Sequence, residues 1–245
     1  MRLSLIFITG STDGLGREAA LSLLSQGHKV VVHARNRQRL DAVQDLIEQG
    51  AQAVVGDLSD LKQVKEVAEQ VNKLGRMDAI IHNAAVNESP QVLTVNVVAP
   101  YILTALITVP NRLIYLSSSM HFGGRLALKE FDFTKQKSSA SYSDSKLCLT
   151  AFAAAIARLW PTVVSSSVDP GWVPTKMGGP SAPDDLQLGH KTQEWLATSD
   201  EAEALVSGAY WHYQRRIEPR ADVHDQSFQD ELLHKLEAAT GIALP

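Results

Sequence analysis

The amino-acid sequence predicts an α/β protein: a single domain, residues 1–245, built on a doubly wound parallel sheet with helices on both faces. Short apolar runs of strand length alternate with longer segments whose apolar residues recur at helical spacing. Six such runs interleaved with helices indicate a parallel sheet, and right-handed crossovers place the helices on both faces. The length and a hydrophobic content of 44% fit one domain with a full core.

The first five elements occupy the chain up to residue 55. Residues 3–9, LSLIFIT, form an apolar run that predicts the first strand, and residues 17–25 predict the helix after a glycine-rich turn. Residues 29–34, KVVVHA, predict the second strand, because valine favours a pleated sheet. Residues 37–49 carry leucine, valine and isoleucine at helical spacing and end at a glycine, and residues 52–55 predict the third strand.

Four elements follow in the middle of the chain. Residues 61–74 predict a helix that a glycine ends, and residues 79–82, AIIH, predict the fourth strand. Residues 91–107 have a helical period and predict a helix despite their β-branched residues and an internal proline. Residues 112–116, RLIYL, predict the fifth strand.

The last predicted helix, strand and loop lie between residues 143 and 189. Residues 143–160 predict a long helix that a proline stops, and residues 163–168 predict the sixth strand. Residues 178–189, GGPSAPDDLQLG, are dense in glycine, proline and aspartate, which predicts a loop. A loop of this length is usually functional, and we expect it to be mobile and to close over a bound ligand.

The composition excludes several classes of protein. A net charge of -4 argues against nucleic-acid binding, which usually needs a basic face. No apolar run reaches the roughly 18 residues of a membrane span, and the start, MRLSLIFITG, leads directly into a glycine-rich turn like a first strand. With Cys148 as the single cysteine and eight scattered histidines, we expect no disulfide, no metal and a cytoplasmic location.

The stretch TGSTDGLG lies between the first predicted strand and the first helix. Glycines there let the backbone approach a pyrophosphate, and the helix N-terminus offers N–H groups and partial positive charge. A plain glycine-rich turn is the alternative, but the position after strand one favours a phosphate site. The expected cofactor contacts in this stretch are Gly10, Ser11, Thr12, Asp13, Gly14, Leu15 and Gly16.

Tyr142 and Lys146 form a second candidate pattern in the stretch SYSDSK. Four residues apart, they lie one turn apart on the same face of a helix. A nearby ammonium favours the phenolate and lowers the pKa of a tyrosine, so the pair could transfer a proton. Ordinary helix surface is the alternative reading of this spacing.

These two patterns together make the chain resemble the short-chain dehydrogenase/reductase family. The glycine spacing is Gly-x3-Gly-x-Gly, and further matching stretches follow the predicted strands in the family's order over residues 3–175. They are Asp57-Leu58, Asn83-Ala84-Ala85, Asn96, Ser117-Ser118-Ser119 and the stretch PGWVPT. Two departures are Ala85, where the family usually has glycine, and a shortened segment between Asn83 and Asn96.

The resemblance implies a Rossmann-type fold and roles for the matching residues. Tyr142 would be the general acid in carbonyl reduction and the base in alcohol oxidation, with its pKa lowered by Lys146 and by oxidised nicotinamide. Lys146 would also bind the nicotinamide ribose, Ser118 the substrate oxygen, and Asn96 a water relay to Lys146. Further implied cofactor contacts are Asp57, Leu58, Asn83, Ala84, Ala85, Pro170, Gly171, Val173 and Thr175.

Some of these roles have alternatives. Ser119 could replace Ser118 as the reactive serine, and Ser117 is expected to be structural. Asn96 could instead satisfy a helix kink near Pro100. Cys148 is expected to be a small buried hydrophobe rather than a nucleophile.

The end of the second strand predicts NADP(H) rather than NAD(H). Relatives that prefer NAD place an acid there for the 2′-hydroxyl, whereas this chain has Ala34 followed by Arg35. Arginine binds a phosphate through two parallel charge-assisted hydrogen bonds. Arg37 could add a second charge or point to solvent, and Arg35 could itself be a plain surface residue.

The resemblance implies an NADP(H)-dependent oxidoreductase that transfers a hydride between nicotinamide and a carbonyl or secondary alcohol substrate. His121, Phe122, Trp172 and Met177 are candidates for a pocket for a medium-sized apolar or aromatic carbonyl compound, although His121 could be a plain loop residue. A cofactor-binding sensor or scaffold and a sugar-nucleotide epimerase or dehydratase are the alternatives. The small apolar run at residues 151–157 suggests a homodimer or homotetramer, unless it packs on its own sheet.

Overall fold

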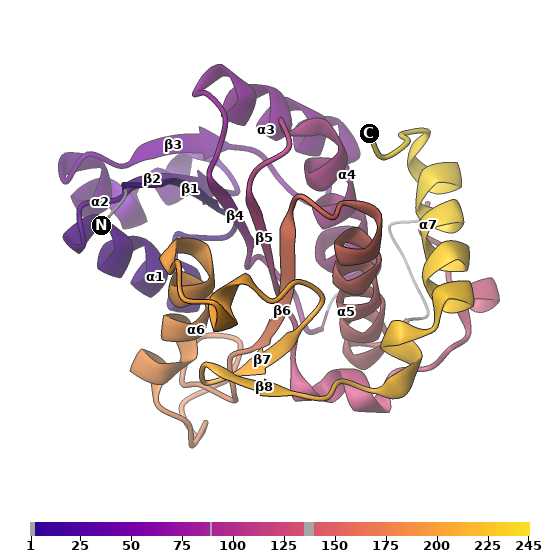
Figure 1. The fold of residues 1–245 in the computed structure, drawn as a ribbon. Coiled ribbons are helices and arrows are strands. Elements are labelled where there is room, and N and C mark those ends of the chain that lie inside the picture. Colours follow the sequence, from indigo (N-terminus) through magenta and orange to yellow (C-terminus); the bar gives the residue numbers. More distant parts are fainter. Residues whose placement is uncertain (1–2, 89, 135–139) are drawn as a thin grey trace.

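The computed structural model describes residues 3–88, 90–134 and 140–245. Its centre is one eight-stranded sheet in the order β3-β2-β1-β4-β5-β6-β7-β8, drawn in Figure 1. The strands are β1 Leu5–Ile8, β2 Lys29–Ala34, β3 Gln52–Val55, β4 Ala79–His82, β5 Arg112–Leu116, β6 Val164–Asp169, β7 Tyr210–His212 and β8 Arg215–Ile217. The first seven are parallel and β8 is antiparallel, so the predicted doubly wound parallel sheet is confirmed.

Helices cover both faces of the sheet (Figure 1). They are α1 Gly14–Ser25, α2 Gln44–Glu48, α3 Leu61–Lys73, α4 Ala99–Leu106, α5 Tyr142–Leu159, α6 Leu186–Thr198 and α7 Gln226–Thr240. Helices α1 and α6 pack together on one face, while α3, α4 and α5 lie on the other with α7 against α5. Among the helices of the described residues, none has the length and apolar character that a bilayer span needs.

Two apolar cores result from the alternation of side chains along the buried strands. Phe7, Val31 and Ile80 point toward α3, α4 and α5. Ile6 and Ile8, their neighbours in sequence, point toward α1 and α6. A parallel strand with helices on both faces is apolar on both sides, which is why its sequence reads as a continuous apolar run.

The predicted helix at residues 91–107 has a π-helical turn over Thr94–Val98 before α4 begins. Pro100 lies in the first turn of α4 and has no N–H to donate to the carbonyl of Asn96 four residues earlier. The α-helical hydrogen-bond pattern is therefore interrupted at the residue that the sequence singled out. The predicted helix at 37–49 is similarly divided, into a 3₁₀ segment Arg37–Val43 and the short α2.

The predicted loop at 178–189 ends earlier than expected, because α6 begins at Leu186. Asp185 caps this helix by accepting the backbone N–H of Gln187 at 2.7 Å. Aspartate is frequent both in loops and at helix N-caps, and Asp185 serves here as the N-cap of α6. The loop proper therefore spans 178–185.

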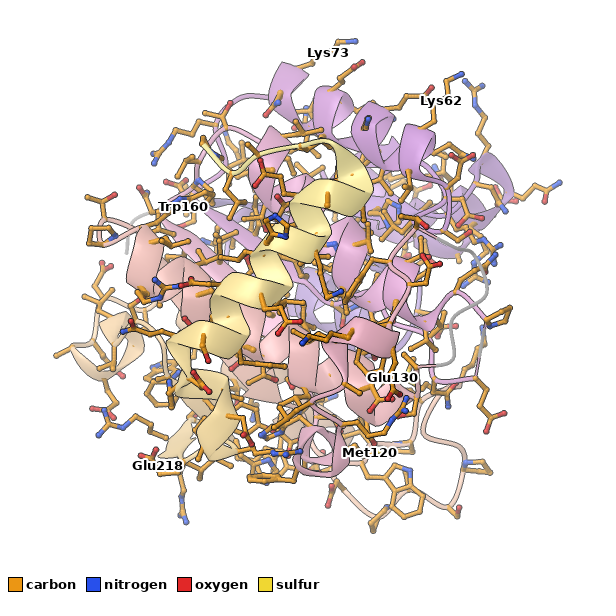
Figure 2. All side chains as sticks on the ribbon, turned by 90° about the vertical axis from the view of Figure 1, so that its right-hand side faces the viewer. Lys62, Lys73, Met120, Glu130, Trp160 and Glu218 are labelled. Carbon is orange, nitrogen blue, oxygen red and sulfur yellow. The ribbon has the colours of Figure 1, made fainter. Side chains whose placement is uncertain are left out.

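No element is predicted beyond residue 189, yet β7, β8 and α7 complete the fold there. Strands β7 and β8 form a hairpin whose two turn residues, Tyr213 and Gln214, have φ of 48° and 59°. Turns of this kind normally use asparagine and glycine, so a Tyr-Gln pair gives no turn signal. Figure 2 shows α7 crossing over α5 between Trp160 and Met120. Near its end the chain is held by Tyr101, whose hydroxyl donates to the carbonyl of Ile242 at 2.6 Å.

The small apolar run at residues 151–157 packs within its own chain. Ala151, Phe152 and Ala155 are fully buried, and α7 covers the outer side of this helix. The run therefore packs against its own chain over most of its length, with Ala157 partly exposed, and the homodimer or homotetramer stays a prediction.

A capping box fixes the start of α5. The Ser141 hydroxyl accepts the N–H of Asp144 at 3.1 Å, and the Asp144 carboxylate accepts the N–H of Ser141 at 2.8 Å. Arg125 donates its backbone N–H to Asp144 at 2.7 Å and its guanidinium at 2.9 Å. Burial raises the pKa of Asp144, but the hydrogen bonds from Arg125 and Ser141 outweigh it and hold that pKa below its usual value. These bonds position the helical turn that carries Tyr142 and Lys146.

Asp144→Ala is expected to lower the free energy of unfolding by about 2–3 kcal/mol, because it removes a helix cap and the acceptor of several charge-assisted hydrogen bonds. Urea unfolding measures the loss. Asp60→Ala is the matched control, since Asp60 caps α3 through two backbone N–H groups without an arginine partner. Its loss should be smaller, and equal losses would contradict the role given to Arg125.

Candidate active site

The glycine-rich turn joins β1 to α1 in a conformation that suits glycine. Gly10 and Gly14 have φ of 64° and 52°, in the left-handed region where other residues are strained. A Cβ on Gly16 would collide with the side-chain amide of Asn83 and with the carbonyl of Gly10. Asp13 caps α1 by accepting the N–H of Gly14 at 2.8 Å. The turn thus brings its backbone and the N-terminus of α1 to the carboxyl end of the sheet.

Asn83 and His33 hold this turn in place. The amide of Asn83 donates to the carbonyls of Thr9 and Gly10 at 2.9 and 3.2 Å. Nδ1 of His33 accepts the N–H of Gly10 at 3.0 Å, so its Nε2–H donates to the carbonyl of Gly56 at 2.8 Å. Burial lowers the pKa of His33, which fits the neutral ring that this pattern requires. Sequence reasoning identified Asn83 and missed His33, which carries no motif.

A cavity of about 600 Å³ opens at the carboxyl ends of the strands, beside this turn. It brings together most of the residues predicted from the sequence. Those lining it are Gly10, Thr12, Asp13, Gly14, Leu15, Arg35, Asp57, Leu58, Asn83, Ala84, Ala85, Tyr142, Lys146, Pro170, Thr175 and Met177. The predicted residues that do not line it are Ser11, Gly16, Asn96, Ser118, His121, Phe122, Gly171, Trp172 and Val173.

Three of the predicted cofactor contacts that do not line the cavity support the cavity wall instead. The Ser11 hydroxyl donates to the carbonyl of Ile8 at 2.9 Å and accepts the N–H of His33 at 2.8 Å. Gly16 allows the close approach of α1 to Asn83, and Val173 is buried. These residues lie behind the residues that line the cavity and hold them in position.

Two arginines lie near the end of the cavity at β2, each beside an aspartate. Nε of Arg35 lies 2.7 Å from a carboxylate oxygen of Asp57 and its side chain is mostly exposed. Arg39, which the sequence analysis did not select, reaches the glycine-rich turn, where it donates to the hydroxyl of Thr12 at 3.3 Å and lies 3.6 Å from Asp13. Arg37 is exposed. The second cation near the turn is therefore Arg39 rather than Arg37, because the 3₁₀ segment redirects the chain.

Tyr142 and Lys146 lie close together on α5, with Nζ of Lys146 5.3 Å from the centre of the Tyr142 ring. Lys146 is buried and its Nζ donates to the carbonyl of Leu116 at 2.5 Å. Burial lowers the pKa of Lys146 to about 7, against the opposing charge of Asp169. Burial also raises the pKa of Tyr142 to about 12, with a further rise from Asp169 and a decrease from a hydrogen bond with Ser118.

In the protein without cofactor, burial is the first cause acting on both groups: it raises the pKa of Tyr142 and lowers that of Lys146, because a charged form loses hydration there. The lowering of the Tyr142 pKa that we expect from Lys146 and oxidised nicotinamide stays a prediction for the cofactor-bound site.

The three serines after β5 have different environments. Ser117 is buried and its hydroxyl lies 2.6 Å from that of Thr150, which is the structural role that we expected. Ser118 hydrogen-bonds to Tyr142 and caps the following 3₁₀ segment by accepting the N–H of Met120 at 3.2 Å. Ser119 is exposed. The geometry thus brings Ser118 to the tyrosine.

Asn96 is buried and connects three parts of the site. Its amide oxygen accepts the N–H of Val86 at 2.9 Å, and its amide group donates to the carbonyl of Val86 and to the hydroxyl of Ser145, both at 2.9 Å. Its side chain therefore does not satisfy the helix at Pro100. Both amide hydrogens have protein partners, and the water relay from Asn96 to Lys146 stays a prediction.

The four residues proposed for the substrate pocket separate into two groups. Met177 lines the cavity, while Phe122 and Trp172 are half-exposed outside it. His121 is fully buried: its Nε2 accepts the N–H of Arg220 at 3.1 Å, so its Nδ1–H donates to the carbonyl of Ser118 at 2.8 Å. His121 is thus neither a pocket residue nor a plain loop histidine, because the 3₁₀ segment turns it inward against Tyr210.

Two charged residues beside the site were missed by sequence reasoning. The Lys176 ammonium forms an ion pair with Asp13 at the edge of the cavity, and the pKa of Asp13 is lowered first by this hydrogen bond. Asp169, at the end of β6, is a buried carboxylate whose charge reaches both Tyr142 and Lys146. Neither forms a recognisable motif in the sequence, because each acts on a residue far away along the chain.

Cys148 is buried within α5, and burial raises the pKa of its thiol, as expected for a small apolar residue rather than a nucleophile. Within the described residues, no group of three or more His, Cys, Asp or Glu side chains could hold a metal ion.

Comparison with known proteins agrees with this arrangement. The family model described as short chain dehydrogenase matches residues 4–109. The uncharacterized oxidoreductase AN7799 of Emericella nidulans is 37% identical over an alignment of 256 positions with gaps, which covers 98% of this chain and 98% of that protein. The short-chain dehydrogenase chry4 of Gibberella zeae is 34% identical over an alignment of 254 positions with gaps, again with 98% of both chains covered.

A solved structure shows the same fold. The crystal structure of a blue fluorescent protein from a metagenomic library, in complex with NADPH, aligns with a TM-score of 0.71 at 20% identity over 85% of this chain and 95% of that chain. The family model and the two relatives cover the glycine-rich turn, and the relatives extend over the Tyr142–Lys146 helix and beyond it. The chain therefore belongs to the short-chain dehydrogenase/reductase family.

Proposed function

We propose that this protein is an NADP(H)-dependent oxidoreductase that reduces a small carbonyl compound to a secondary alcohol, with Tyr142 as the general acid. The observation that carries the proposal is the cavity in which Tyr142 and Lys146 lie opposite the glycine-rich turn. The turn suits a pyrophosphate, because Gly10, Gly14 and Leu15, at the turn and the N-terminus of α1, line the cavity. Bound cofactor supplies the hydride.

The residues around the carbonyl carbon then have separate tasks. A carbonyl oxygen that gains negative charge during hydride transfer needs a proton donor within hydrogen-bond reach, and the protonated phenol of Tyr142 is that donor. Ser118, hydrogen-bonded to Tyr142, would hold the same oxygen in place. Lys146 would donate from its buried ammonium toward the cofactor ribose, and its binding to the carbonyl of Leu116 keeps it directed at the site.

Arg35 and Arg39 support a 2′-phosphate rather than a free 2′-hydroxyl. Both lie near the end of β2, where Ala34 leaves no carboxylate to repel a phosphate. The hydrogen bond to Asp57 orients the guanidinium of Arg35, and the hydrogen bond to Thr12 orients that of Arg39. Both guanidinium groups are therefore partly ordered before a ligand binds. The NADPH in the structurally similar blue fluorescent protein is consistent with this choice.

Tyr142→Phe should lower the turnover of carbonyl reduction by at least about 100-fold, because the general acid is lost. NADPH binding, measured by its fluorescence, should stay unchanged. Absorbance of NADPH with a panel of quinone, aromatic ketone, steroid and retinal substrates reports turnover. Lys146→Ala should weaken cofactor binding and turnover together.

Tyr101→Phe is the matched control, since the Tyr101 hydroxyl binds the C-terminal segment far from the cavity. It should leave turnover unchanged. If Tyr142→Phe kept more than about a tenth of the activity, general acid catalysis of the usual size could not be its role.

The ratio of kcat/KM for NADPH to that for NADH should be well above one. Arg35→Ala and Arg39→Ala should each lower NADPH affinity by roughly ten- to a hundredfold and leave NADH affinity unaffected, because each removes a charge-assisted contact with the 2′-phosphate. Arg37→Ala, an exposed arginine from the same segment, is the control. A ratio at or below one in the unmodified protein would overturn the cofactor assignment.

The loop at 178–185 should gain protection from hydrogen exchange when NADPH and a substrate analogue bind. It is joined to the cofactor side through Thr175, which accepts the N–H groups of Gly178 and Gly179, and through the Lys176–Asp13 ion pair. An exposed pair of this kind is weak on its own, so the free loop should open readily. Equal exchange with and without ligands would show that the loop does not close.

A further inference from the structure

The hairpin turn between β7 and β8 has a strained backbone. Among the described residues, Tyr213 and Gln214 are the only non-glycine residues with positive φ, at 48° and 59°. A side chain in this left-handed region is crowded by the backbone, so such a conformation persists only where the surrounding structure holds it. The turn is held at α6, because the N–H of Gln214 donates to the hydroxyl of Thr192 at 3.0 Å. A tyrosine kept in this conformation indicates that its side chain has a role.

The register of the sheet places this turn beside the loop that follows β6. Strand β7 runs parallel to β6, and His212 pairs with Asp169. The chain therefore leaves both strands at the same edge of the sheet, with Tyr213 after His212 and with Pro170 and Gly171 after Asp169. Pro170 lines the cavity. The hairpin turn thus lies next to the start of a segment that belongs to the candidate active site.

The Tyr213 side chain occupies the space over Gly171. A Cβ on Gly171 would collide with the Tyr213 hydroxyl and would lie 2.7 Å from a carboxylate oxygen of Asp184. The ring of His212 packs against the ring of Tyr213, with the ring centres 3.9 Å apart. The tyrosine ring is therefore supported by β7, and its hydroxyl end rests on the backbone of the loop.

Trp172 and Asp184 close the base of this loop, residues 172–184. The N–H of Trp172 donates to the Asp184 carboxylate at 2.6 Å, and the N–H of Asp184 donates to the carbonyl of Trp172 at 3.1 Å. These two hydrogen bonds bring the ends of the loop together. Tyr213 lies against them through its contacts with Gly171 and the Asp184 carboxylate.

The loop carries residues of the cavity wall. Thr175, Lys176 and Met177 line the cavity. A Cβ on Gly14 of the glycine-rich turn would lie 3.1 Å from the methyl group of Thr175, so the loop also touches that turn. Because both ends of the loop meet at its base, the position of the base determines where these residues lie.

We propose that Tyr213 is a positioning residue whose side chain fixes the base of the loop 172–184 and thereby holds Thr175 and Met177 at the cavity. The backbone strain of the hairpin turn is the cost of placing a tyrosine there. The effect on turnover rests on the proposed function, whereas the contact with the loop does not. The base of the loop then stays fixed while the residues beyond it open and close.

Hydrogen exchange of the cofactor-free protein, followed residue by residue by NMR, tests the contact without substrate or turnover. Tyr213→Asn removes the ring and introduces a residue that this turn prefers, so the hairpin should stay folded. The amides of Trp172 and Asp184 should exchange about tenfold faster, because the packing that keeps their hydrogen bonds closed is lost. The amides of the β7–β8 ladder should keep their protection. Tyr213→Gly replaces the asparagine variant if that variant does not fold.

Gln214→Gly is the matched control. The Gln214 side chain is exposed, and glycine relieves the strain at the second position of the same turn. This variant should raise Tm by about 2–4 °C and leave the exchange of Trp172 and Asp184 unchanged. Unchanged exchange of both amides in Tyr213→Asn would overturn the proposal. Faster exchange in Gln214→Gly would also overturn it, because the turn rather than the tyrosine would then hold the loop.

A kinetic measurement gives the second readout. If the base of the loop is in place for only part of the time, the apparent affinity for ligands falls by that fraction. KM for NADPH and for a carbonyl substrate should therefore rise about two- to tenfold in Tyr213→Asn, while kcat at saturation changes by less than about twofold. A lower kcat with unchanged KM would indicate a merely structural role and contradict the proposal. If no carbonyl compound is reduced, the proposed function fails, whereas hydrogen exchange still decides whether Tyr213 holds the loop.

Discussion

The burial of Lys146 is the constraint on which the site depends. An ammonium group 2% exposed to solvent needs hydrogen-bond acceptors inside the protein, and the carbonyl of Leu116 at the end of β5 supplies one at 2.5 Å. This bond sets the height of α5 against the sheet and therefore the position of Tyr142 one turn earlier. The same burial lowers the pKa of Lys146 to about 7, so the group is close to losing the charge that the proposed reaction uses.

Around this point, buried polar side chains form a rigid frame. His33, Asn83, Asn96 and His121 each bind backbone groups of a neighbouring loop. A buried polar group without a partner is costly, so each of these residues restricts the loop that satisfies it. The frame explains why the cavity has its shape before any ligand binds. The frame also explains why Ser11, Gly16 and Asn96, which belong to the family's motifs, lie behind the cavity wall rather than on its surface.

The C-terminal part of the chain completes the site from the other side. The hairpin of β7 and β8 extends the sheet beyond β6, and it places Tyr210 and His212 next to the end of that strand. Helix α7 covers α5 and closes the larger core with Phe228, Leu232 and Leu236. This segment contributes no residue to the family's motifs, yet it supplies the side chains that bury Asp169 at the end of β6.

The sequence by itself determined the alternation of strands and helices up to β6, the glycine-rich turn and the Tyr142–Lys146 pair, because these depend on local periodicity and on spacing within one turn. Only the tertiary structure decided the environment of each group. Arg39, rather than Arg37, reaches the glycine-rich turn, which depends on the path of the 3₁₀ segment Arg37–Val43. The hairpin of β7 and β8 could not be predicted from the sequence, because Tyr213 and Gln214 are not typical turn residues. Protonation states depend on desolvation and on charges brought together by folding, which no local pattern in the sequence records.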